Sequence, residues 1–512
     1  MLKKLPLSAS FKQLVFIFLC SAHALAQYPA VVEQNLVKAG NNRIELEKAI
    51  AYCKKSGDPL KLKAIYFLIS SMDIHNSSDY YWENTAGAKI PYNELEYPDF
   101  EGAVKAFELI KEQNPGLQPK KIILKDLENI KADYLTANIE QAFSAWKESP
   151  VNNISFEDFC QYILPYRASV EPLQDWRTAY RTKFAWLRDR IQSDGFETTL
   201  PFVRDEANSW FANTWGSGAR KEPLPRLGSL QLLLRKQGNC DDLADLGIFT
   251  MRATGIPAAI NIIPYWATST GGHSINVFFG DNNESVLFDY GSKEINEKLR
   301  REPAKVLRLT YSKQPETLAS FEDPENIPKG YLRDQNYIDV TQEYWKTSTI
   351  QCDLYPAPAY SKIVYLATFN GLSWKPFWWG KTNNNKAEFT RICQGTVVLP
   401  QYYNNDKMTN AGPPVIVTDG ETRVLAPDLN QSRDISITQL TNYLIFKPGA
   451  VYKLFYWNDG WKLIDAQTAT QTTQSLLFTK VPKNALLLLL ASSSKGYERP
   501  FIIDDKGERT WF

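Results

Sequence analysis

Three residues in the middle of the chain have the types and the order needed for thiol chemistry. Cys240, His273 and Asp289 follow one another at intervals of 33 and 16 residues. The reactive form of cysteine is the thiolate, which a nearby imidazolium or the positive end of a helix stabilises. A carboxylate that accepts the other imidazole N–H fixes the histidine tautomer. If the fold brings these side chains together, they can act as nucleophile, base and orienting carboxylate.

The residues around the cysteine predict that Cys240 lies at the start of a helix. Asn239 is a typical cap residue, and Asp241 and Asp242 place acidic side chains in the first turn. Gly255 is expected to end the helix. A thiol at this position would lie beside the unpaired N–H groups of the first turn, which favour negative charge.

Short apolar segments after this helix predict strands that would carry the other two residues. His273 begins one segment and Asp289 ends the next. If the two strands are neighbours in a sheet, the imidazole and the carboxylate lie side by side. The predicted strands are residues 258–263, 273–279 and 285–289.

Cysteine and histidine are scarce, which narrows the choice of site residues. The chain has six cysteines and three histidines. Five of the cysteines and two of the histidines lie after residue 26. The two histidines after residue 26 are His273 and His75. His75 lies in a region expected to be helical, with no cysteine motif near it. No CxxC pair occurs, so no structural zinc site is expected. The remaining cysteines are interpreted as structural, with disulfide pairing left open: Cys53, Cys160, Cys352 and Cys393.

The segment 238–291 resembles the core of the transglutaminase-like superfamily. That superfamily has a papain-like fold and includes transglutaminases, peptide:N-glycanases and cysteine proteases. The likeness covers about a tenth of the chain. It rests on Gly238-Asn239-Cys240, on Asp242 and Ala244, on the string Arg-Ala-Thr-Gly-Ile-Pro-Ala at 252–258, and on His273 and Asp289 at strand ends.

The resemblance implies a nucleophile at Cys240, a general base and acid at His273, and an orienting carboxylate at Asp289. The family reaction is attack on an amide or ester carbonyl to give a thioester, which water hydrolyses or an amine converts to a crosslink. It needs neither a metal nor an organic cofactor. The Cys240 backbone N–H and one side-chain donor would hold the oxyanion. The sequence leaves three donors open: Gln237, Trp210 and Trp215.

Two positions depart from the pattern of the superfamily. Many members have an aromatic residue two positions after the catalytic histidine, where this chain has Ile275. Animal transglutaminases have Trp where this chain has Asp241, and a carboxylate there opposes thiolate formation unless it points away. Two hypotheses therefore stay open. One is a cysteine protease, amidase or acyltransferase acting on peptide or glycopeptide amides, and the other is an inactive scaffold whose β domains bind glycan or protein.

The chain is predicted to be a multidomain α+β protein, because helical spacing dominates its first part and short strands its last. At roughly 100–200 residues per domain, 512 residues correspond to about three or four domains. The predicted parts are a signal peptide (1–26), a helical N-terminal region (27–150), a papain-like transglutaminase core (151–330) and two β-sandwiches (331–430 and 431–512).

The C-terminal part repeats itself, which indicates a duplication. Residues 364–374 (VYLATFNGLSW) align with residues 451–461 (VYKLFYWNDGW) at an offset of 87. Each copy has the size of a small β-sandwich. The aromatic side chains of the copies are interpreted as core, with glycan binding as the alternative. The same offset relates Tyr365 to Tyr452, Trp374 to Trp461, and Gly420 to Gly507.

The first 26 residues have the pattern of a secretory signal peptide. Lys3 and Lys4 precede a short apolar run at 14–20, and Ala-Leu-Ala at 24–26 suits cleavage after Ala26. The apolar run is too short to span a bilayer. We therefore expect an exported bacterial protein, periplasmic or extracellular, without a membrane span. The net charge is +1 with no basic stripe, so the expected partner is a peptide, protein or glycopeptide and not nucleic acid.

Overall fold

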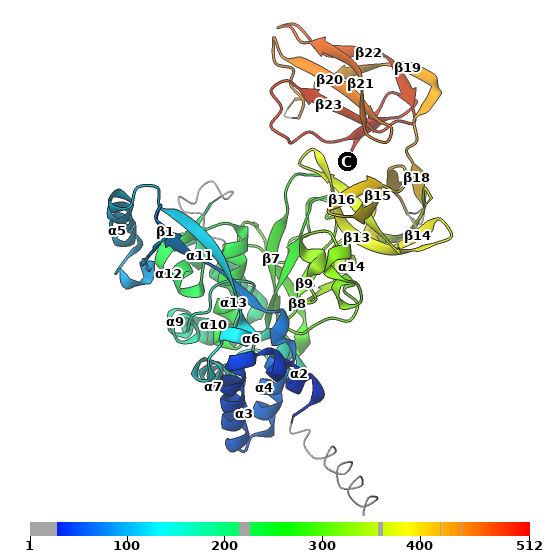
Figure 1. The fold of residues 1–512 in the computed structure, drawn as a ribbon. Helices are drawn as coiled ribbons and strands as arrows, with labels where there is room; N and C mark the ends of the chain where they lie inside the picture. The colour runs from blue at the N-terminus through cyan, green and yellow to red at the C-terminus, as the bar shows by residue number, and fades with distance from the viewer. Residues whose placement is uncertain (1–27, 215–225, 357–361, 420, 442) are drawn as a thin grey trace, which may run out of the picture.

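The computed structural model describes residues 28–214, 226–356, 362–419, 421–441 and 443–512 (Figure 1). Helices dominate the first part of this chain and strands the last, as expected for a multidomain α+β protein. Three predictions fall outside the described residues, namely the signal peptide (1–26), Trp215 and Gly420. No helix among the described residues combines the length and the apolar character that a membrane crossing requires.

A group of helices packs around one apolar core at the N-terminal end of the molecule. In α4 the buried residues Ala64, Ile65, Leu68 and Ile69 recur at helical spacing, so one face of the helix meets its neighbours. The same core includes Tyr311 from much later in the chain. The helices are α2 (Ala30–Lys38), α3 (Arg43–Lys55), α4 (Pro59–Ser71), α6 (Asp126–Asn129), α7 (Ala132–Lys147) and α8 (Phe156–Tyr162).

The region predicted to be helical at 27–150 contains a sheet between α4 and α6, which the prediction did not include. There the chain forms a sheet with the order β2-β1-β3, from β1 (Asn76–Glu83), β2 (Lys89–Ile90) and β3 (Gln118–Lys125), together with α5 (Phe100–Gln113). β1 and β3 pair along their whole length. The aromatic side chains of β1 and the β-branched side chains of β3 favour extended backbone, which outweighs the weak helical spacing. We call residues 76–125 the N-terminal arm.

The middle of the chain forms an antiparallel five-stranded sheet covered by helices, with the strand order β10-β9-β6-β7-β8. The predicted helix at Cys240 and the predicted strands at 258–263 and 273–279 are confirmed as α13, β6 and β7. The strands are β6 (Ala258–Ile263), β7 (His273–Phe279), β8 (Ser285–Phe288), β9 (Leu307–Leu309) and β10 (Tyr337–Asp339). The helices are α9 (Arg177–Lys183), α10 (Trp186–Asp194), α11 (Phe196–Trp210), α12 (Ser229–Arg235), α13 (Cys240–Thr254) and α14 (Thr341–Tyr344).

Two glycines allow α13 to approach its neighbours closely. A Cβ atom at Gly247 would clash with the Asn276 side chain on β7, whose amide donates to the Ala244 carbonyl at 2.8 Å. Gly255 ends α13 at φ +87°, and a Cβ atom there would clash with the Ala145 carbonyl of α7. The helix is therefore fixed against both the sheet and the N-terminal helices.

The C-terminal part consists of two β units. The first β unit has β11 (Thr347–Asp353), β12 (Ile363–Asn370), β13 (Ser373–Asn383), β14 (Lys386–Cys393), β15 (Val397–Asn404), β16 (Lys407–Asn410), β17 (Val415–Val417) and β18 (Thr422–Val424). The second β unit has β19 (Asp428–Thr438), β20 (Val451–Trp457), β21 (Trp461–Thr468), β22 (Ser475–Lys483), β23 (Leu487–Ala491), β24 (Phe501–Ile503) and β25 (Arg509–Trp511).

The strand orders of the two units support the predicted duplication. The order β13-β12-β15-β17-β18 in the first unit matches β21-β20-β23-β24-β25 in the second. The matching strands begin 86 to 90 residues apart. In the first unit, however, β14 pairs with both β11 and β13, so one continuous eight-stranded sheet curls until β11 meets β18. The first predicted sandwich is therefore corrected to a barrel-like sheet.

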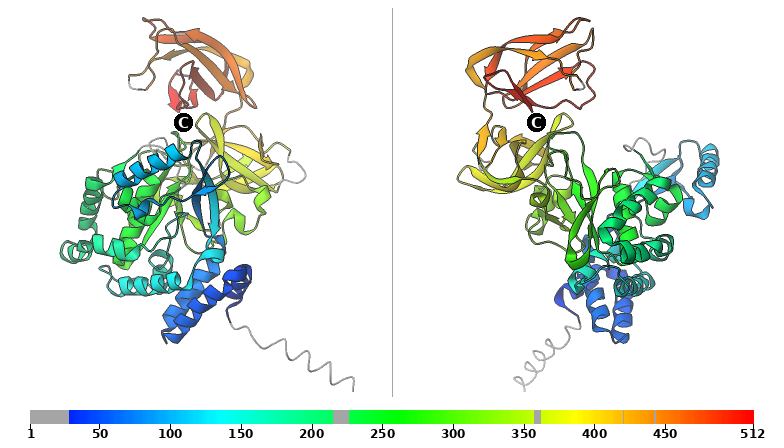
Figure 2. Two further views of the ribbon diagram at one scale, coloured as in Figure 1. Left: turned by 60° about the vertical axis from the view of Figure 1, so that its left-hand side comes forward. Right: turned by 180° about the vertical axis from the view of Figure 1, so that it is seen from behind.

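An apolar interface joins the two β units. The second β unit stands at the far end of the molecule from α2, α3 and α4, with the first β unit between it and the five-stranded sheet (Figures 1 and 2). Both units contribute fully buried side chains, so they pack as one body. The buried residues are Val397, Leu399, Ile416 and Leu425 from the first unit and Trp457, Leu486, Ile502 and Phe512 from the second.

Candidate active site

Cys240 is the first residue of α13, and the cap of that helix is fixed from both sides. The Asn239 side-chain oxygen accepts the backbone N–H groups of Asp241 (3.0 Å) and Asp242 (3.2 Å). In return, the Asp242 carboxylate accepts the Asn239 N–H at 2.9 Å. This capping box holds the half-buried Cys240 thiol at the positive end of a 15-residue helix.

His273 connects the predicted nucleophile to the predicted carboxylate. It is the first residue of β7, and Asp289 directly follows β8, the antiparallel neighbour of β7. His273 Nε2 lies 2.7 Å from Asp289 Oδ2, and the imidazole also hydrogen-bonds with Cys240. Asp289 Oδ1 accepts the Gly291 N–H at 2.9 Å, which fixes the carboxylate. The structure thus brings all three predicted residues together.

Hydrogen bonds outweigh burial in determining the pKa values of His273 and Asp289. Burial lowers the pKa of His273, but its bonds to Asp289 and Cys240 raise that pKa to about 10. Burial raises the pKa of Asp289, and the bonds from His273 and the Gly291 N–H bring it below its ordinary value. At neutral pH the pair is therefore an imidazolium and a carboxylate. The positive charge that stabilises a thiolate is in place.

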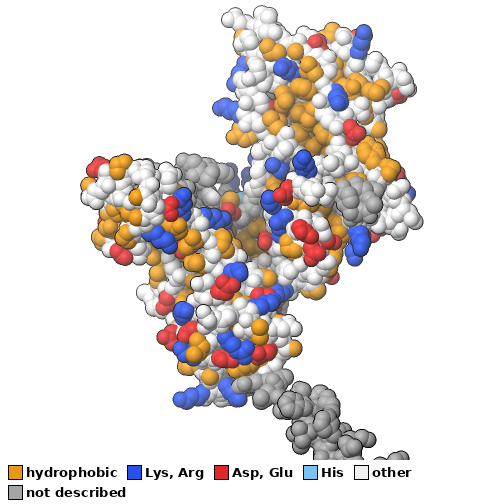
Figure 3. All heavy atoms as spheres, viewed as in Figure 1, with side chains coloured by type: hydrophobic (Ala, Val, Ile, Leu, Met, Phe, Trp, Pro, Cys, Tyr) orange, Lys and Arg blue, Asp and Glu red, His pale blue; other side chains and the backbone are white. Residues whose placement is uncertain are grey.

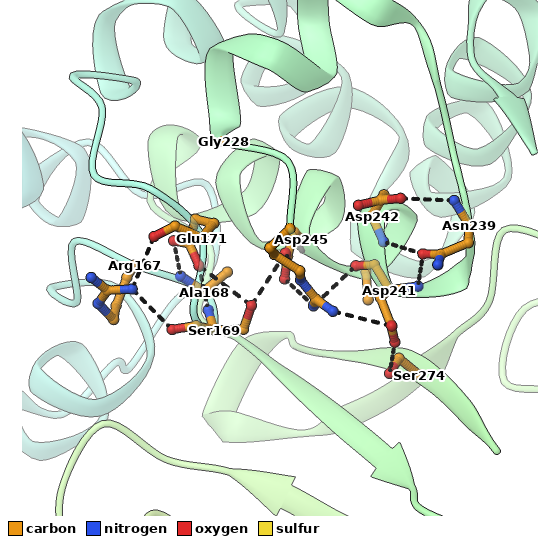
Figure 4. A network of polar contacts seen from close by, with 12 residues as sticks. Arg167, Ala168, Ser169, Glu171, Gly228, Asn239, Asp241, Asp242, Asp245 and Ser274 are labelled. Atoms are coloured by element: carbon orange, nitrogen blue, oxygen red, sulfur yellow. Dashed lines mark hydrogen bonds and ion pairs between the residues drawn. The ribbon is translucent and has the colours of Figure 1, made fainter. Parts of the chain in front are cut away.

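The Asp241 carboxylate, one residue after the thiol, is held by other partners (Figure 4). Its Oδ1 accepts the Ser274 hydroxyl at 2.6 Å, and its Oδ2 lies 3.2 Å from an Arg226 nitrogen. The negative charge next to the nucleophile is thus compensated. Because Asp241 follows Cys240 and Ser274 follows His273, the Ser274–Asp241 hydrogen bond joins the segments that carry Cys240 and His273.

A buried charged network lies behind this bond (Figure 4). Arg226 binds the fully buried Asp245 of α13 through two nitrogens, at 2.8 and 3.0 Å. Burial raises the pKa of Asp245, and the guanidinium opposes that effect. The Ser169 hydroxyl lies 3.3 Å from Asp245, and the Glu171 carboxylate accepts the Ser169 backbone N–H at 2.8 Å. This network anchors the first turns of α13 to the segment that precedes α9.

Ile275, the second departure from the superfamily pattern, is a core residue. Only 2% of it is exposed, and it packs with Ile263, Leu287 and Val306. It fills the space beneath the sheet and has no polar atom to offer a site. Its side chain is therefore explained by packing.

The loop 265–272 places an indole beside His273. The Trp266 ring lies 6.2 Å from the imidazole, with 28° between the ring planes. Asn370, at the end of β12 in the first β unit, fixes this loop. Its amide donates to the carbonyls of Trp266 (3.0 Å), Ser269 (3.0 Å) and Gly271 (2.9 Å), and its oxygen accepts the Gly271 N–H at 3.0 Å.

Arg499 reaches the same loop from the second β unit. Its buried guanidinium donates to the carbonyls of Ala267 and Ser269 in the loop. It also donates to the carbonyls of Phe369 and Phe512, one in each β unit. Both β units therefore hold the loop that precedes His273. Sequence reasoning missed Asn370 and Arg499, since 99 or more residues separate them from their partners.

Two of the three oxyanion donors predicted from the sequence lie at or next to a short pair of parallel strands. Gln237 is on β5 (Gln237–Gly238), which pairs with β4 (Ala212–Asn213). Trp210 is the last residue of α11, and its buried indole N–H has no hydrogen-bond partner within the described part of the chain. The third, Trp215, lies outside the described residues. Of these donors, Trp210 has an N–H group that is still unused.

The other described cysteines differ from Cys240 in being buried. Burial raises the pKa of Cys53 to about 11 and that of Cys160, Cys352 and Cys393 to about 12. All five cysteines in the described part of the chain are unpaired. Across the same residues, no group of three or more His, Cys, Asp or Glu side chains is placed to hold a metal ion.

Comparisons with known proteins add little to this geometry. No family model and no curated protein matches the chain. Among solved structures, the chain is similar to the transglutaminase of red sea bream, with 10% identity over 83% of this chain and 76% of that one. The TM-score of 0.21 is too low for this likeness to carry an argument about the fold or the activity.

Proposed function

We propose that this protein is a cysteine-dependent amide hydrolase or acyltransferase that acts on peptide or glycopeptide amides through a thioester on Cys240. The observation that carries the proposal is the position of His273, which bonds to Asp289 at 2.7 Å and to the thiol at the start of α13. The pattern of residues 1–26 extends the proposal to an exported protein that acts in the periplasm or outside the cell.

The proposed reaction has two halves. The Cys240 thiolate attacks the amide carbonyl, and the oxyanion binds the Cys240 backbone N–H and one of the three proposed side-chain donors. The His273 imidazolium protonates the departing amine, the C–N bond breaks, and a thioester remains. Water then gives its proton to His273 and attacks the thioester, which releases a carboxylic acid and restores the thiolate. An amine in place of water would form a new amide.

Hydrolysis is the favoured outcome of the second half-reaction. An exported enzyme meets water at far higher concentration than any amine, and the sequence contains no DxDxDG calcium loop. Asp289 stays ionised throughout and keeps the imidazole oriented.

Replacing the nucleophile tests the proposal. The mature chain is assayed by mass spectrometry against a library of peptide and glycopeptide amides. Cys240→Ala should abolish turnover with an unchanged melting temperature. Cys53→Ala, the same substitution at a buried cysteine of α3, should retain turnover. Turnover that survives in Cys240→Ala would overturn the proposal.

One observation favours the alternative of glycan or protein binding. A cavity of about 290 Å³ lies between the loop 265–272 and the second β unit, lined by Thr268, Leu440, Tyr443, Trp511 and Phe512. Aromatic walls of this kind suit the apolar faces of sugars. A glycan array probed with the full chain and with Trp511→Ala decides this alternative. Binding that is lost in the variant supports it, and the absence of binding to every glycan rejects it.

A further inference from the structure

We propose that the cavity between the N-terminal arm and β5 is a recognition subsite for a neutral aromatic group of the substrate. This inference rests on Cys240 as the nucleophile and names a chemical class for the group beside the scissile amide. The cavity has a volume of about 370 Å³, which suits an aromatic group of naphthyl or indole size.

Two parts of the chain build this cavity. Aromatic side chains of the arm form its outer wall, including Tyr80 and Trp82 of β1 and Phe100 and Phe107 of α5. The inner wall includes Gln237 and Gly238 of β5. In Figures 1 and 3 the arm forms a separate lobe around α5, with many hydrophobic side chains on its surface.

The position of β5 connects the cavity to the nucleophile. Gly238 lies two residues before Cys240, and its carbonyl accepts the Thr214 N–H at 2.7 Å, so this part of the wall is fixed. Two residues of extended chain span roughly 7 Å. A group joined to the scissile amide by a short linker can therefore reach the cavity from the thiol.

The charges at the wall favour a neutral ligand. Arg235 of α12 binds Glu94 of the arm at 2.7 to 2.9 Å, and both side chains are buried. The guanidinium also lies 5.0 Å from the centre of the Phe100 ring. The opposite charges compensate each other, and Glu108, a further charged residue of the wall, pairs with Lys111 at 2.9 Å. Among the described residues of the wall, a charged ligand would therefore meet no free counter-charge.

Two polar groups at the wall indicate an acceptor on the ligand. The Trp82 Nε1–H and the Thr214 hydroxyl are buried and have no hydrogen-bond partner among the residues that the structure describes. Buried donors without partners are rare, because each loses its bond to water. An aromatic group that carries an ether or carbonyl oxygen would supply the missing acceptor. The arm and β5 together thus select an aromatic group with one acceptor.

The first experiment compares two alkylating probes on the mature full-length protein. Iodoacetamide is small, and N-(6-methoxy-2-naphthylmethyl)iodoacetamide carries the proposed group. In both reactions the thiolate displaces iodide and forms a C–S bond, and peptide mass spectrometry follows Cys240. We expect the naphthyl probe to react at least about tenfold faster, with saturating kinetics, because it binds before it reacts. Equal rates in the wild type would overturn the inference.

Two matched substitutions on α5 locate the effect. Val104 lines the cavity, so Val104→Trp should fill it and bring the ratio of the two rates close to one. Leu109 is 58% exposed, so Leu109→Trp should leave the ratio unchanged. The iodoacetamide rate should be the same in both variants. A ratio that Val104→Trp does not change would also overturn the inference.

A binding measurement separates this inference from the proposed function. Calorimetric titration with unreactive N-(6-methoxy-2-naphthylmethyl)acetamide does not depend on the thiol. Binding to the wild type that weakens in Trp82→Phe, which keeps an aromatic side chain and removes the N–H, supports the subsite. If Cys240 is inert towards iodoacetamide while this ligand binds, the proposed function fails and the subsite stands. If the thiol reacts and the ligand does not bind, the subsite fails alone.

Discussion

The two described histidines, His75 and His273, lie beside carboxylates and aromatic rings, yet at neutral pH His75 is neutral and His273 is positively charged. His75 is buried and stacks on Tyr311, with ring centres 4.2 Å apart. Its Nε2 lies 2.8 Å from the Tyr311 carbonyl, which can only accept a hydrogen bond, so this nitrogen carries the proton. Burial lowers the pKa of His75 to about 4. The pKa of His273 is raised to about 10.

Burial lowers the pKa of both imidazoles, and the two histidines differ in whether the nearby carboxylate bonds to the imidazole and offsets that burial. Asp126 is close to His75, but it accepts two bonds from Arg167, at 2.6 and 2.7 Å, and one from Tyr166 at 2.8 Å. Among the described residues, Asp289 has one hydrogen bond besides that to His273, from the Gly291 backbone N–H. Asp126 raises the pKa of His75 through its charge alone, and burial outweighs that effect, whereas Asp289 also hydrogen-bonds to the His273 imidazole. His75 is a structural residue, and His273 holds a charge beside a thiol.

The largest expected effect is on the reactivity of Cys240 towards iodoacetamide at pH 6. His273→Ala should lower this rate by about 100-fold, because an unassisted thiol is almost fully protonated at that pH. His75→Gln is the matched control and should leave the rate unchanged, provided that circular dichroism shows a folded protein. Peptide mass spectrometry after timed alkylation measures both rates. Equal losses in the two variants would break the distinction between the two histidines.

The next effect is on the free energy of unfolding, and His75 determines how this free energy changes on the acidic side. The pKa of His75 is lower in the folded protein than in the unfolded chain, so the unfolded state binds the extra proton as the pH falls from 6.5 to 4. Stability should therefore fall on acidification, by about 2 kcal/mol between pH 7 and 4.5 from this group. His75→Gln should remove that share of the slope in urea unfolding, and an unchanged slope would show that His75 is charged in the fold.

His273 predicts the opposite slope. Its pKa is raised by folding, so its contribution is complete below pH 6.5 and is lost as the pH rises towards 10. The side chain is 25% exposed, and solvent screening reduces the expected contribution to about 1 kcal/mol between pH 7 and 9. In urea unfolding, His273→Gln should flatten the alkaline side of the stability profile and His75→Gln the acidic side. A flattening of the same side by both variants would contradict the comparison.

Local signals in the sequence were enough to predict the elements that carry Cys240 and His273. The Asn239 cap and the Gly255 end are properties of neighbouring residues, and α13 begins and ends as they predict. The strand beginning at His273 follows from its own apolar pattern. The arm was mispredicted because its helical spacing is weak and the pairing of β1 with β3 is not local.

The partners of the site could not be predicted, because they depend on contacts between distant segments. From the sequence, the Asp241 carboxylate is expected to oppose ionisation of the adjacent Cys240 thiol. In the fold, Arg226 and Ser274 bind this carboxylate. Nothing in the residues around Asn370 or Arg499 marks them as partners of the loop 265–272. The contacts of Asn370 and Arg499 with this loop form only when the β units pack against it.

A smaller effect is expected where the first β unit holds the loop beside His273. Asn370→Ala removes four hydrogen bonds to this loop, so Trp266 should lose its fixed place beside the imidazole. We expect alkylation of Cys240 to slow by about three- to tenfold at pH 6 and to change little at pH 9, where thiols ionise without help. Asn383→Ala, an exposed position in the same β unit, is the control. A loss that is independent of pH would indicate general unfolding instead.

The smallest expected effect tests whether the Asp241 carboxylate leaves the Cys240 thiolate undisturbed because both of its oxygens are bonded to other groups. Ser274→Ala removes the hydrogen bond to Oδ1 of Asp241, while Arg226 still binds Oδ2. Asp241 then has a free oxygen, unlike Asp126, whose oxygens are both bonded to other side chains. Its charge should then oppose the thiolate and slow alkylation of Cys240 at pH 6 by about two- to threefold. Adding Asp241→Asn removes the charge and should restore the rate, although the hydrogen bond is still missing. If the double variant is as slow as Ser274→Ala, the bond acts by positioning the two segments, and carboxylate occupancy does not explain the difference between the histidines.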